Sequence, residues 1–594
     1  MTRNEAPATT SYKLSHSAIG EYNATIGSAL RRLVPLMADE RRFVVQALVA
    51  VTITTATSLL APAIISHTVD TYIQNRNYTG VLQFSAILLG VFVVGLFSTY
   101  YQTQRMGTVG RRVLFKLRNA LFTKLQQLPL DFFNQNKAGD LISRINNDTD
   151  KLNMFFAQAL VQLAGNVFLM AGAAIFLLAF NIRLGIAALM PALGVLILTR
   201  LISGWVKRKN VKSLQALGGV SAEIQERLSN FKVIVAFNRR DYFRRKFHDA
   251  NERNFTASVG AGLASNIFVP VYGLAFNLAQ LIALSYGVYL IAAGQLSVGV
   301  LIGVLLYVNS FYFPLRQLAA TWASFQMALA GLDRISAVLA LESNMPVIPA
   351  TPARSAAVLE FDHVAFRYPG GADVLADATF ALERGKTYAL VGPTGGGKTT
   401  TASLMARLYD PVGGRVLLDG RDIRSYQPEE RTKKVGFILQ EPFLFTGTIR
   451  DNVLYGNEPY QSYSNDQIVA LLAEKNLDSL LARFEHGLDT TVTAAGDAVS
   501  LGQKQLIAFM RAVLRDPEIL ILDEATANID TVTEQLLEQI LARLPRSTTK
   551  VIIAHRLNTI ANADEIFFIN SGEIIPAGSM EHALDMLLHG KRAS

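Results

Sequence analysis

The sequence Gly392-Pro-Thr-Gly-Gly-Gly-Lys398-Thr399 indicates the class of the C-terminal domain. It fits the pattern G-x-x-x-x-G-K-[ST] of a phosphate-binding loop at every fixed position. An apolar strand is expected at 388–391 and a helix at 400–408. Glycines let the backbone fold closely around phosphate oxygens, and the helix N-terminus adds its positive dipole end. We therefore expect a bound nucleotide, ATP, to contact Gly392, Pro393, Thr394, Gly395, Gly396, Gly397, Lys398, Thr399 and Thr400.

Two carboxylates end a second apolar strand, in Ile519-Leu-Ile-Leu-Asp523-Glu524. An unpaired buried charge is costly, so carboxylates at a strand end that faces the phosphate loop indicate a function. We expect Lys398 to reach the β- and γ-phosphates and Thr399 to bind Mg²⁺. Asp523 is placed to hold the Mg²⁺ shell through water. Glu524, on the opposite side of the pleat, can polarise the attacking water.

A histidine follows a third apolar strand, at 551–554. From there His555 can touch the γ-phosphate and orient the attacking water. A histidine taken alone is more often a structural group, but the matching strand in front of His555 favours the catalytic role. Strand and helix signals alternate through this region, so we expect an α/β domain with a mostly parallel sheet covered on both faces.

The N-terminal half of the chain carries long apolar segments. Half of the 594 residues are hydrophobic, and the mean hydropathy is positive. Cysteine is absent, which excludes disulfides, thiolate metal sites and a cysteine nucleophile. A membrane span needs about 20 largely apolar residues. We expect an all-α domain of six spans, at about 43–69, 78–104, 156–181, 184–206, 262–292 and 296–316.

Lysine and arginine gather in two of the connections between these segments. The connection 105–151 holds nine of them and 207–253 holds twelve, whereas each of the others holds at most one. Because cationic residues accumulate on the cytosolic side, both termini and the ATPase domain are expected there. The same bias accounts for most of the excess that gives the net charge of +9, so no nucleic-acid partner is expected. Each long connection is interpreted as two helical extensions joined by a turn; two small soluble inserts are the alternative.

These signals predict the order of the domains. An N-terminal tail occupies 1–40, in which 26–36 is either a short helix on the membrane surface or part of a partly ordered lead into the first span, and the transmembrane domain occupies 41–340. The three prolines between 344 and 352 place a linker at 341–356. The nucleotide-binding domain then covers 357–594. We expect a multi-pass integral protein of the cell membrane, inner or plasma.

The order of these motifs resembles the nucleotide-binding domain of ABC transporters, which is an α/β P-loop NTPase. The six spans are similar to the transmembrane half of a multidrug or lipid exporter, a type IV half-transporter. The resemblance covers nearly the whole chain from about residue 25. It implies that Tyr368 stacks on adenine, although a half-buried strand tyrosine is the alternative. It also implies that Gln440 senses Mg²⁺ and the γ-phosphate and that Asp530 belongs to the D-loop.

The signature of the family, usually L-S-G-G-Q, reads Val499-Ser500-Leu501-Gly502-Gln503 in this chain. In the family, the signature of one subunit closes over ATP held by the other. The side chain of Leu501 replaces a glycine whose bare backbone approaches the γ-phosphate. With Glu524 and His555 intact, this resembles the catalytically competent subunit of a heterodimeric exporter. The alternative is a homodimer that tolerates Leu501, because leucine suits a first helical turn.

Polar groups in the last two spans are uncharged, which favours an apolar or amphipathic cargo such as a drug, lipid or peptide. Helix packing is the alternative role for each of them: Asn266, Asn277, Gln280, Tyr307, Asn309 and Tyr312. The resemblance therefore implies ATP-driven export by alternating access through a dimer of half-transporters. Three other functions stay open: a homodimeric exporter, an ATP-gated channel and a regulatory membrane subunit. A soluble ABC ATPase of DNA repair or translation would lack the six spans.

Overall fold

The computed structural model describes residues 12–14, 34–350, 356–493, 499–523, 531–553, 562–570, 572–578 and 580–589. The chain forms two compact units. The helical unit comprises Leu14–Gln126 and Ala138–Ala340. The sheet unit comprises Met1–Lys13, Gln127–Lys137 and Leu341–Ser594, so a short piece of the first half of the sequence belongs with the C-terminal domain.

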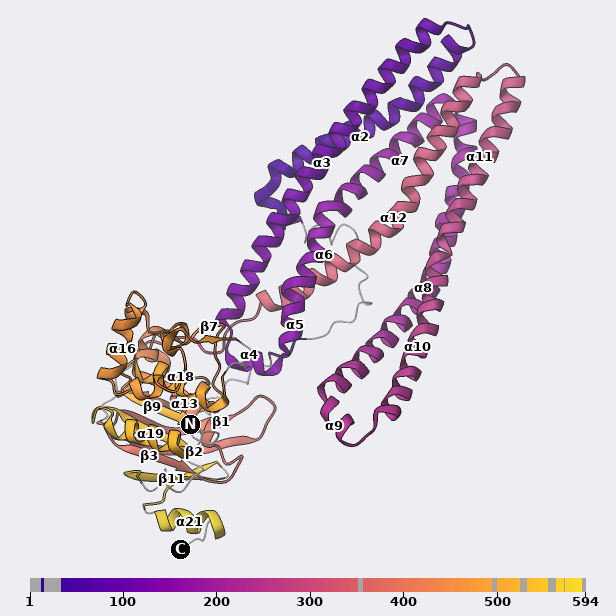
Figure 1. Cartoon of the computed structure of the whole chain (residues 1–594). Coiled ribbons are helices and arrows are strands. Elements are labelled where there is room, and N and C mark those ends of the chain that lie inside the picture. Colours follow the sequence, from indigo (N-terminus) through magenta and orange to yellow (C-terminus); the bar gives the residue numbers. More distant parts are fainter. Residues whose placement is uncertain are drawn as a thin grey trace, which may run out of the picture. The chain divides into compact units, whose positions relative to one another are not determined.

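Six helical stretches in the described chain are long and apolar enough to cross a membrane (Figure 1). They cover Pro35–Ile73, Tyr78–Gln127, Ala138–Phe180, Ile182–Ser229, Arg240–Ala292 and Val298–Leu318. The prediction of six apolar helices followed by a sheet-containing domain is confirmed. The elements are η1 (Val34–Glu40), α2 (Arg41–Thr68), η2 (Val69–Ile73), α3 (Tyr78–Gln127), α5 (Ala138–Ser143), η3 (Arg144–Asp148), α6 (Thr149–Met154), η4 (Phe155–Ala159), α7 (Leu160–Phe180), α8 (Ile182–Ser229), α9 (Phe231–Ala236), α10 (Arg240–Asn266), α11 (Phe268–Ala292) and α12 (Val298–Leu339).

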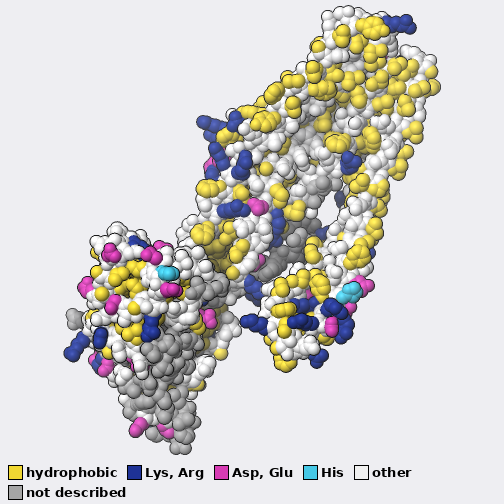
Figure 2. All heavy atoms as spheres, viewed as in Figure 1, with side chains coloured by type: hydrophobic (Ala, Val, Ile, Leu, Met, Phe, Trp, Pro, Cys, Tyr) yellow, Lys and Arg dark blue, Asp and Glu magenta, His cyan; other side chains and the backbone are white. Residues whose placement is uncertain are grey.

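Both lysine- and arginine-rich connections are helical, as the sequence predicted, and not separate inserts. In the first, α3 continues to Gln127 and the short helix α4 (Leu130–Gln135) precedes α5. In the second, α9 joins the ends of α8 and α10. Figure 2 shows hydrophobic side chains over one end of the helical unit and Lys and Arg side chains gathered towards the other. This distribution is expected of a membrane domain whose apolar end lies in the bilayer and whose Lys- and Arg-rich end lies outside it.

The outer turns of the bundle are tight. The side chain of Asn181 caps α8 by accepting hydrogen bonds from the N–H groups of Arg183 and Leu184, at 3.1 and 3.0 Å. A Cβ on Gly185 would lie 2.6 Å from the carbonyl oxygen of Leu177, so only glycine lets α8 pass α7 this closely. The cap by Asn181 and the missing side chain of Gly185 make the one-residue connection between α7 and α8 possible.

The sheet unit holds a six-stranded sheet of order β12-β11-β3-β10-β9-β6 and a four-stranded sheet of order β2-β1-β4-β5. In the larger sheet β11, β3, β10, β9 and β6 are parallel, and β12 is antiparallel. The strands are β1 (Leu359–Arg367), β2 (Asp373–Leu382), β3 (Thr387–Val391), β4 (Gly413–Leu418), β5 (Arg421–Asp422), β6 (Val435–Ile438), β7 (Gly447–Thr448), β8 (Thr491–Val492), β9 (Ile519–Asp523), β10 (Thr549–Ile553), β11 (Glu565–Asn570) and β12 (Glu573–Pro576). The helices are α13 (Lys398–Met405), η5 (Ile423–Ser425), α14 (Pro428–Lys434), α15 (Ile449–Val453), η6 (Glu458–Tyr460), α16 (Asn465–Glu474), α17 (Asp478–Leu481), η7 (Gly487–Asp489), α18 (Leu501–Val513), α19 (Thr531–Arg543) and α21 (Met580–His589).

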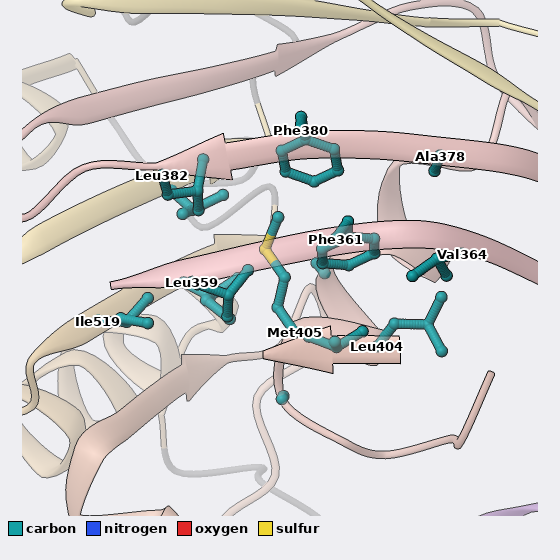
Figure 3. Close-up of a cluster of buried hydrophobic side chains, with 14 of the residues drawn as sticks. Leu359, Phe361, Val364, Ala378, Phe380, Leu382, Leu404, Met405 and Ile519 are labelled. Atoms are coloured by element: carbon teal, nitrogen blue, oxygen red, sulfur yellow. The ribbon is translucent and has the colours of Figure 1, made fainter. Parts of the chain in front are cut away.

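A buried apolar cluster fixes α13 against both sheets (Figure 3). Leu404 and Met405 of α13 are at most 1% exposed and share this cluster with Phe361 of β1 and Ile519 of β9. Burying side chains of this size contributes about 1.5–3 kcal/mol each. The helix that follows the phosphate loop is therefore held rigidly, and the loop itself has a fixed base.

Candidate ATP-binding site

The phosphate loop, residues 392–399, leaves the central sheet at the end of β3 and enters α13. Gly392 has a φ of 149°, and a Cβ there would lie 2.0 Å from the carbonyl oxygen of Ile569 in β11. Gly397 has a φ of 111° and is the N-cap of α13. Only glycine fits both positions without moving the backbone. The loop therefore presents main-chain N–H groups and a helix N-terminus, the arrangement that receives phosphate.

The side chain of Lys398 lies within the loop, where only 6% of it is exposed. Its ammonium donates hydrogen bonds to the carbonyl oxygens of Gly392, at 2.8 Å, and Pro393, at 3.1 Å. These bonds hold the positive charge at the loop, within the region that the β- and γ-phosphates of a bound nucleotide would occupy.

Two oxygen groups suited to Mg²⁺ face each other beside the loop. The hydroxyl of Thr399 donates to Oδ1 of Asp523 at 3.4 Å, and Asp523 is 2% exposed at the end of β9. Mg²⁺ prefers oxygen ligands and keeps several waters, with one or two protein groups completing the shell. In the described part of the chain no three His, Cys, Asp or Glu side chains converge on one point. The pair Thr399 and Asp523 thus fits an ion shared with nucleotide and water.

The order of the strands brings the other predicted groups to the same edge. β10 lies between β3 and β9, and β6 lies on the far side of β9, all four parallel. Their carboxyl ends therefore share one edge, where ligands bind in open α/β sheets. Gln440 is exposed two residues after β6. Glu524 directly follows β9 and His555 follows β10 by two residues, but both, with Asp530, lie outside the described residues.

Tyr368 follows the end of β1 beside the phosphate loop. Its hydroxyl lies 3.0 Å from the hydroxyl of Thr400 in the first turn of α13. Its ring meets Phe366 and Tyr409 edge to face, with centroids 5.0 and 5.4 Å apart. The tyrosine is half-buried and held in one orientation, which suits a platform for an adenine ring.

Tyr409 is a residue of this site that the sequence analysis did not identify. It is 8% exposed, and burial raises the pKa of its phenol to about 12, so the hydroxyl stays protonated. That hydroxyl accepts a hydrogen bond from Nδ2 of Asn134 in α4, at 2.7 Å. A short helix from the first lysine- and arginine-rich connection therefore docks directly behind the Tyr368 ring. The sequence offered only an aromatic residue in Leu-Tyr-Asp-Pro, 408–411, as a signal.

The signature segment caps a helix. Ser500 is the N-cap of α18: its hydroxyl accepts from the N–H of Gln503 at 3.2 Å, and its own N–H donates to Oε1 of Gln503 at 2.9 Å. Leu501 is the first residue of the helix and is 41% exposed, with Gly502 next to it. Ser500 and Gln503, the second and fifth residues of the signature, thus cap the start of α18, and the side chain of Leu501 is exposed there.

The predicted cargo residues divide into two sets. Tyr307 and Tyr312 are at most 3% exposed, and their hydroxyls donate to backbone carbonyls of neighbouring helices: Leu59 at 2.5 Å and Ala188 at 3.0 Å. Gln280 reaches the carbonyl of Leu305 at 3.5 Å. These three groups therefore form hydrogen bonds between neighbouring helices. The other three are exposed in the described chain: Asn266, Asn277 and Asn309.

Two family models match the chain: the ABC transporter transmembrane region over 44–315 and the ABC transporter domain over 375–527. The chain belongs to the ABC transporter family. An uncharacterized ABC transporter ATP-binding protein of Bacillus subtilis is 34% identical over 93% of this chain and 92% of its own length. A fatty acid ABC transporter ATP-binding/permease protein of Mycobacterium tuberculosis is 31% identical over 85% of this chain and 80% of its own.

The solved structure of a bacterial Atm1-family ABC exporter with ATP bound matches with a TM-score of 0.75 and 27% identity. The match covers 90% of this chain and 94% of that one. One membrane domain fused to one ABC domain makes this chain a type IV half-transporter, an integral membrane protein. Its ATPase activity is coupled to transport.

Proposed function

We propose that this half-transporter exports hydrophobic or amphipathic substrates by alternating access, as a dimer with a second half-transporter. One observation carries the proposal: the same chain contains six apolar helical stretches and a phosphate loop that matches the pattern at every fixed position. Relatives named for fatty acid transport and for probable multidrug resistance support this substrate class. The excess of Lys and Arg on the helical extensions supports a cytosolic ATPase domain and cytosolic termini in a cell membrane.

The ATPase step assigns each group of the site a role. The phosphate loop and Lys398 hold the triphosphate, and Thr399 and Asp523 would hold Mg²⁺, with Gln440 beside them. A bound Mg²⁺ supplies positive charge that neutralises the phosphate oxygens. Glu524 polarises the attacking water, and His555 orients it against the γ-phosphate. Tyr368 supports the adenine ring.

The dimer is proposed to be a heterodimer. Leu501 stands exposed at the start of α18, where the family's signature approaches the γ-phosphate of the other subunit. A side chain there hinders that approach, so the site that Leu501 closes is expected to work poorly. ATP at this chain's own phosphate loop must then be closed over by a partner whose signature is unaltered. The catalytic glutamate of that partner is expected to be altered. A homodimer is the second candidate, because Leu501 is well accommodated as a first helical residue.

Uptake into inside-out vesicles tests the export function. Vesicles containing the purified complex should accumulate a fluorescent amphipathic dye or a labelled fatty acid against its gradient only when ATP is hydrolysed. Glu524→Gln should slow hydrolysis by about 10²–10⁴-fold and abolish accumulation while ATP still binds. Flux that ATP switches on but that never exceeds equilibrium would indicate a channel instead. Unchanged turnover in the variant would remove the role given to Glu524.

Co-purification tests the dimer. The chain should be isolated with a second half-transporter whose catalytic glutamate is replaced. A single chain species that forms an active dimer by itself would establish the homodimer and contradict the heterodimer.

A further inference from the structure

Tyr12 is a buried aromatic residue close to the N-terminus. It is 1% exposed in the sheet unit, and its two described neighbours are Lys13 and Leu14. Among the described residues, the hydrogen-bond partners of Tyr12 and the ring that it packs against lie more than a hundred residues away in the sequence. A tyrosine of a terminal segment can be fully buried only where other segments surround its ring and offer hydrogen-bond partners to its hydroxyl.

One side of the structure that surrounds Tyr12 is formed by α4. The N–H of Tyr12 donates to Oε1 of Gln135 at 2.9 Å, and its carbonyl oxygen accepts from Nδ2 of Asn136 at 2.9 Å. Its ring meets the ring of Phe132 edge to face, with centroids 6.3 Å apart. Phe132 is itself completely buried. The N-terminal segment and the end of α4 are therefore joined by two hydrogen bonds and a ring contact.

The other side is formed by the described part of the linker, residues 341–350, which precedes β1. The Tyr12 hydroxyl donates to the carbonyl of Glu342 at 2.9 Å and accepts from the N–H of Asn344 at 2.7 Å. Burial raises the pKa of this phenol, so it keeps the proton that the bond to Glu342 needs. The linker is fixed in turn, because Arg407 donates to the carbonyl of Pro346 at 2.8 Å.

The far side of α4 reaches the ATP-binding site. Asn134 donates to the hydroxyl of Tyr409, whose ring packs on Tyr368. The Tyr368 hydroxyl lies 3.0 Å from Thr400 on the helix that follows the phosphate loop. A continuous set of contacts thus runs from Tyr12 through α4 to the nucleotide-binding residues, all within the sheet unit.

We propose that Tyr12 is a positioning residue for coupling: it fastens α4 to the linker and so sets how nucleotide binding is transmitted to α4. This inference rests on the proposed function, since α4 lies in the connection between the second and third spans of the exporter. In the described part of the chain, the contacts of Tyr12 are with α4 and the linker. Its effect is on the position of α4 behind Tyr409 and Tyr368.

The alternative is a purely structural role, in which the ring only fills a gap. The two roles differ in what the hydroxyl and the ring each control. If Tyr12 positions α4, then removal of the whole side chain frees α4 and the linker together: the hydroxyl bonds to the linker and the ring contact with Phe132 are lost, and without the buried ring the main-chain bonds to Gln135 and Asn136 are no longer held in place. Removal of the hydroxyl alone frees the linker, because the bonds to Gln135 and Asn136 come from the main chain and Phe132 still holds the ring.

Hydrogen–deuterium exchange of the full complex, with and without Mg·ATP, tests this. In the parent chain, ATP should change exchange in peptides that cover 127–137. In Tyr12→Ala, exchange should rise in 127–137 and 341–350, and the response of 127–137 to ATP should be lost while ATP affinity stays within about twofold. In Tyr12→Phe, exchange should rise in 341–350 only. Lys13→Ala, at the exposed neighbour, should change neither.

A transport readout completes the test. The amount of dye accumulated per ATP hydrolysed should fall severalfold in Tyr12→Ala and stay near the parent value in Lys13→Ala. An unchanged response of 127–137 to ATP in Tyr12→Ala, or an unchanged transport ratio, would overturn the proposal. If the parent complex hydrolyses ATP without transport, the export function fails, but the exchange measurements still decide whether Tyr12 positions α4. If Tyr12→Ala does not fold, the linker-specific effect of Tyr12→Phe decides it.

Discussion

Arg334 of α12 and Asp148 of η3 form an ion pair within the extensions of the third and sixth spans. Nε of Arg334 donates to Oδ2 of Asp148 at 2.6 Å, and its Nη2 donates to the other carboxylate oxygen. The two side chains are 16% and 3% exposed. Lys151 adds a second cation to Asp148 at 3.0 Å, and Arg144 donates to the carbonyl of Arg334 at 2.8 Å. The pair therefore ties α12 to the helix of the third span.

Asp148→Asn should destabilise the helical unit. The substitution removes the buried negative charge that faces the two cations Arg334 and Lys151, and loss of the charge of one partner in such a buried pair costs about 3–5 kcal/mol. The midpoint of thermal unfolding in detergent should fall by several degrees. Asp150→Asn is the matched control, because Asp150 is 52% exposed and pairs with Arg118 at the surface, a contact worth at most about 1 kcal/mol. Equal midpoints for the two variants would show that the buried pair does not stabilise this unit.

The same pair predicts how stability depends on pH. Burial by itself raises the pKa of Asp148, but the hydrogen bonds from Arg334 and Lys151 outweigh it and hold the pKa below its ordinary value of 3.8. A carboxylate with a lowered pKa stabilises the fold above that ordinary value and loses the contribution as pH falls through the folded-state pKa. The difference in unfolding midpoint between the parent chain and Asp148→Asn should thus be constant from pH 5 to 7 and shrink below about pH 4. A difference that persists at the lowest pH would contradict this.

The sequence predicted the architecture because its signals are local. Apolar runs as long as 43–69 have one stable form in a bilayer, and the loop at 392–399 matches a pattern at every fixed position. The carboxyl ends of β3 and β9 could be placed together because parallel strands end at a common edge. The interpretation that leucine suits a first helical turn agrees with α18, which begins at Leu501.

Contacts between distant segments were not predictable. Tyr12, Asn134 and Tyr409 carry no pattern, since each depends on which surfaces the fold brings together. The roles of Tyr307 and Tyr312 were left open between cargo and packing, and the structure shows backbone carbonyls as their partners. Only the three-dimensional course of α2 and α8 decides where those carbonyls lie.

Thr399→Val should separate Mg²⁺-dependent chemistry from nucleotide binding. The substitution keeps the shape of the side chain and removes the hydroxyl that lies 3.4 Å from Asp523. ATPase turnover at saturating Mg·ATP should fall by at least about 100-fold, whereas ATP binding measured in EDTA should stay within about threefold. Ser403→Ala, one turn further along α13, removes a hydroxyl bonded to the carbonyl of Thr399 and should leave turnover within about twofold. Parallel losses in the two variants would indicate damage to α13 instead of loss of an ion ligand.

Leu501→Gly should distinguish the two dimers. In the proposed heterodimer, Leu501 closes over ATP at the partner's phosphate loop, where hydrolysis is slow because the partner's glutamate is altered. Overall turnover should therefore change by less than about twofold. The complex should, however, retain more ATP at the partner's loop. In a homodimer the same change lets the signature backbone approach the γ-phosphate at a site with an intact glutamate. Turnover should then rise by about tenfold for each 1.4 kcal/mol by which the activation free energy falls. Leu501→Ala, which keeps Cβ, is the control and should lie between leucine and glycine. Because Leu501 is exposed at the helix start, the glycine variant should lose no more than about 1 kcal/mol of stability.

Tyr368→Ala should weaken binding of ATP but not of inorganic tripolyphosphate. The ring is held edge to face by Phe366 and Tyr409, so it offers adenine a fixed apolar surface, and such ring contacts contribute about 0.5–1.5 kcal/mol. We expect a two- to tenfold increase in the dissociation constant for ATP, about the free energy of one ring pair. Tyr368→Phe keeps the ring and loses only the contact with Thr400, so its ATP affinity should stay near that of the parent chain. Titration with tripolyphosphate, which has no base, decides the cause. If Tyr368→Ala weakens both ligands equally, the tyrosine acts through Thr400 on the phosphate loop and does not stack on the base.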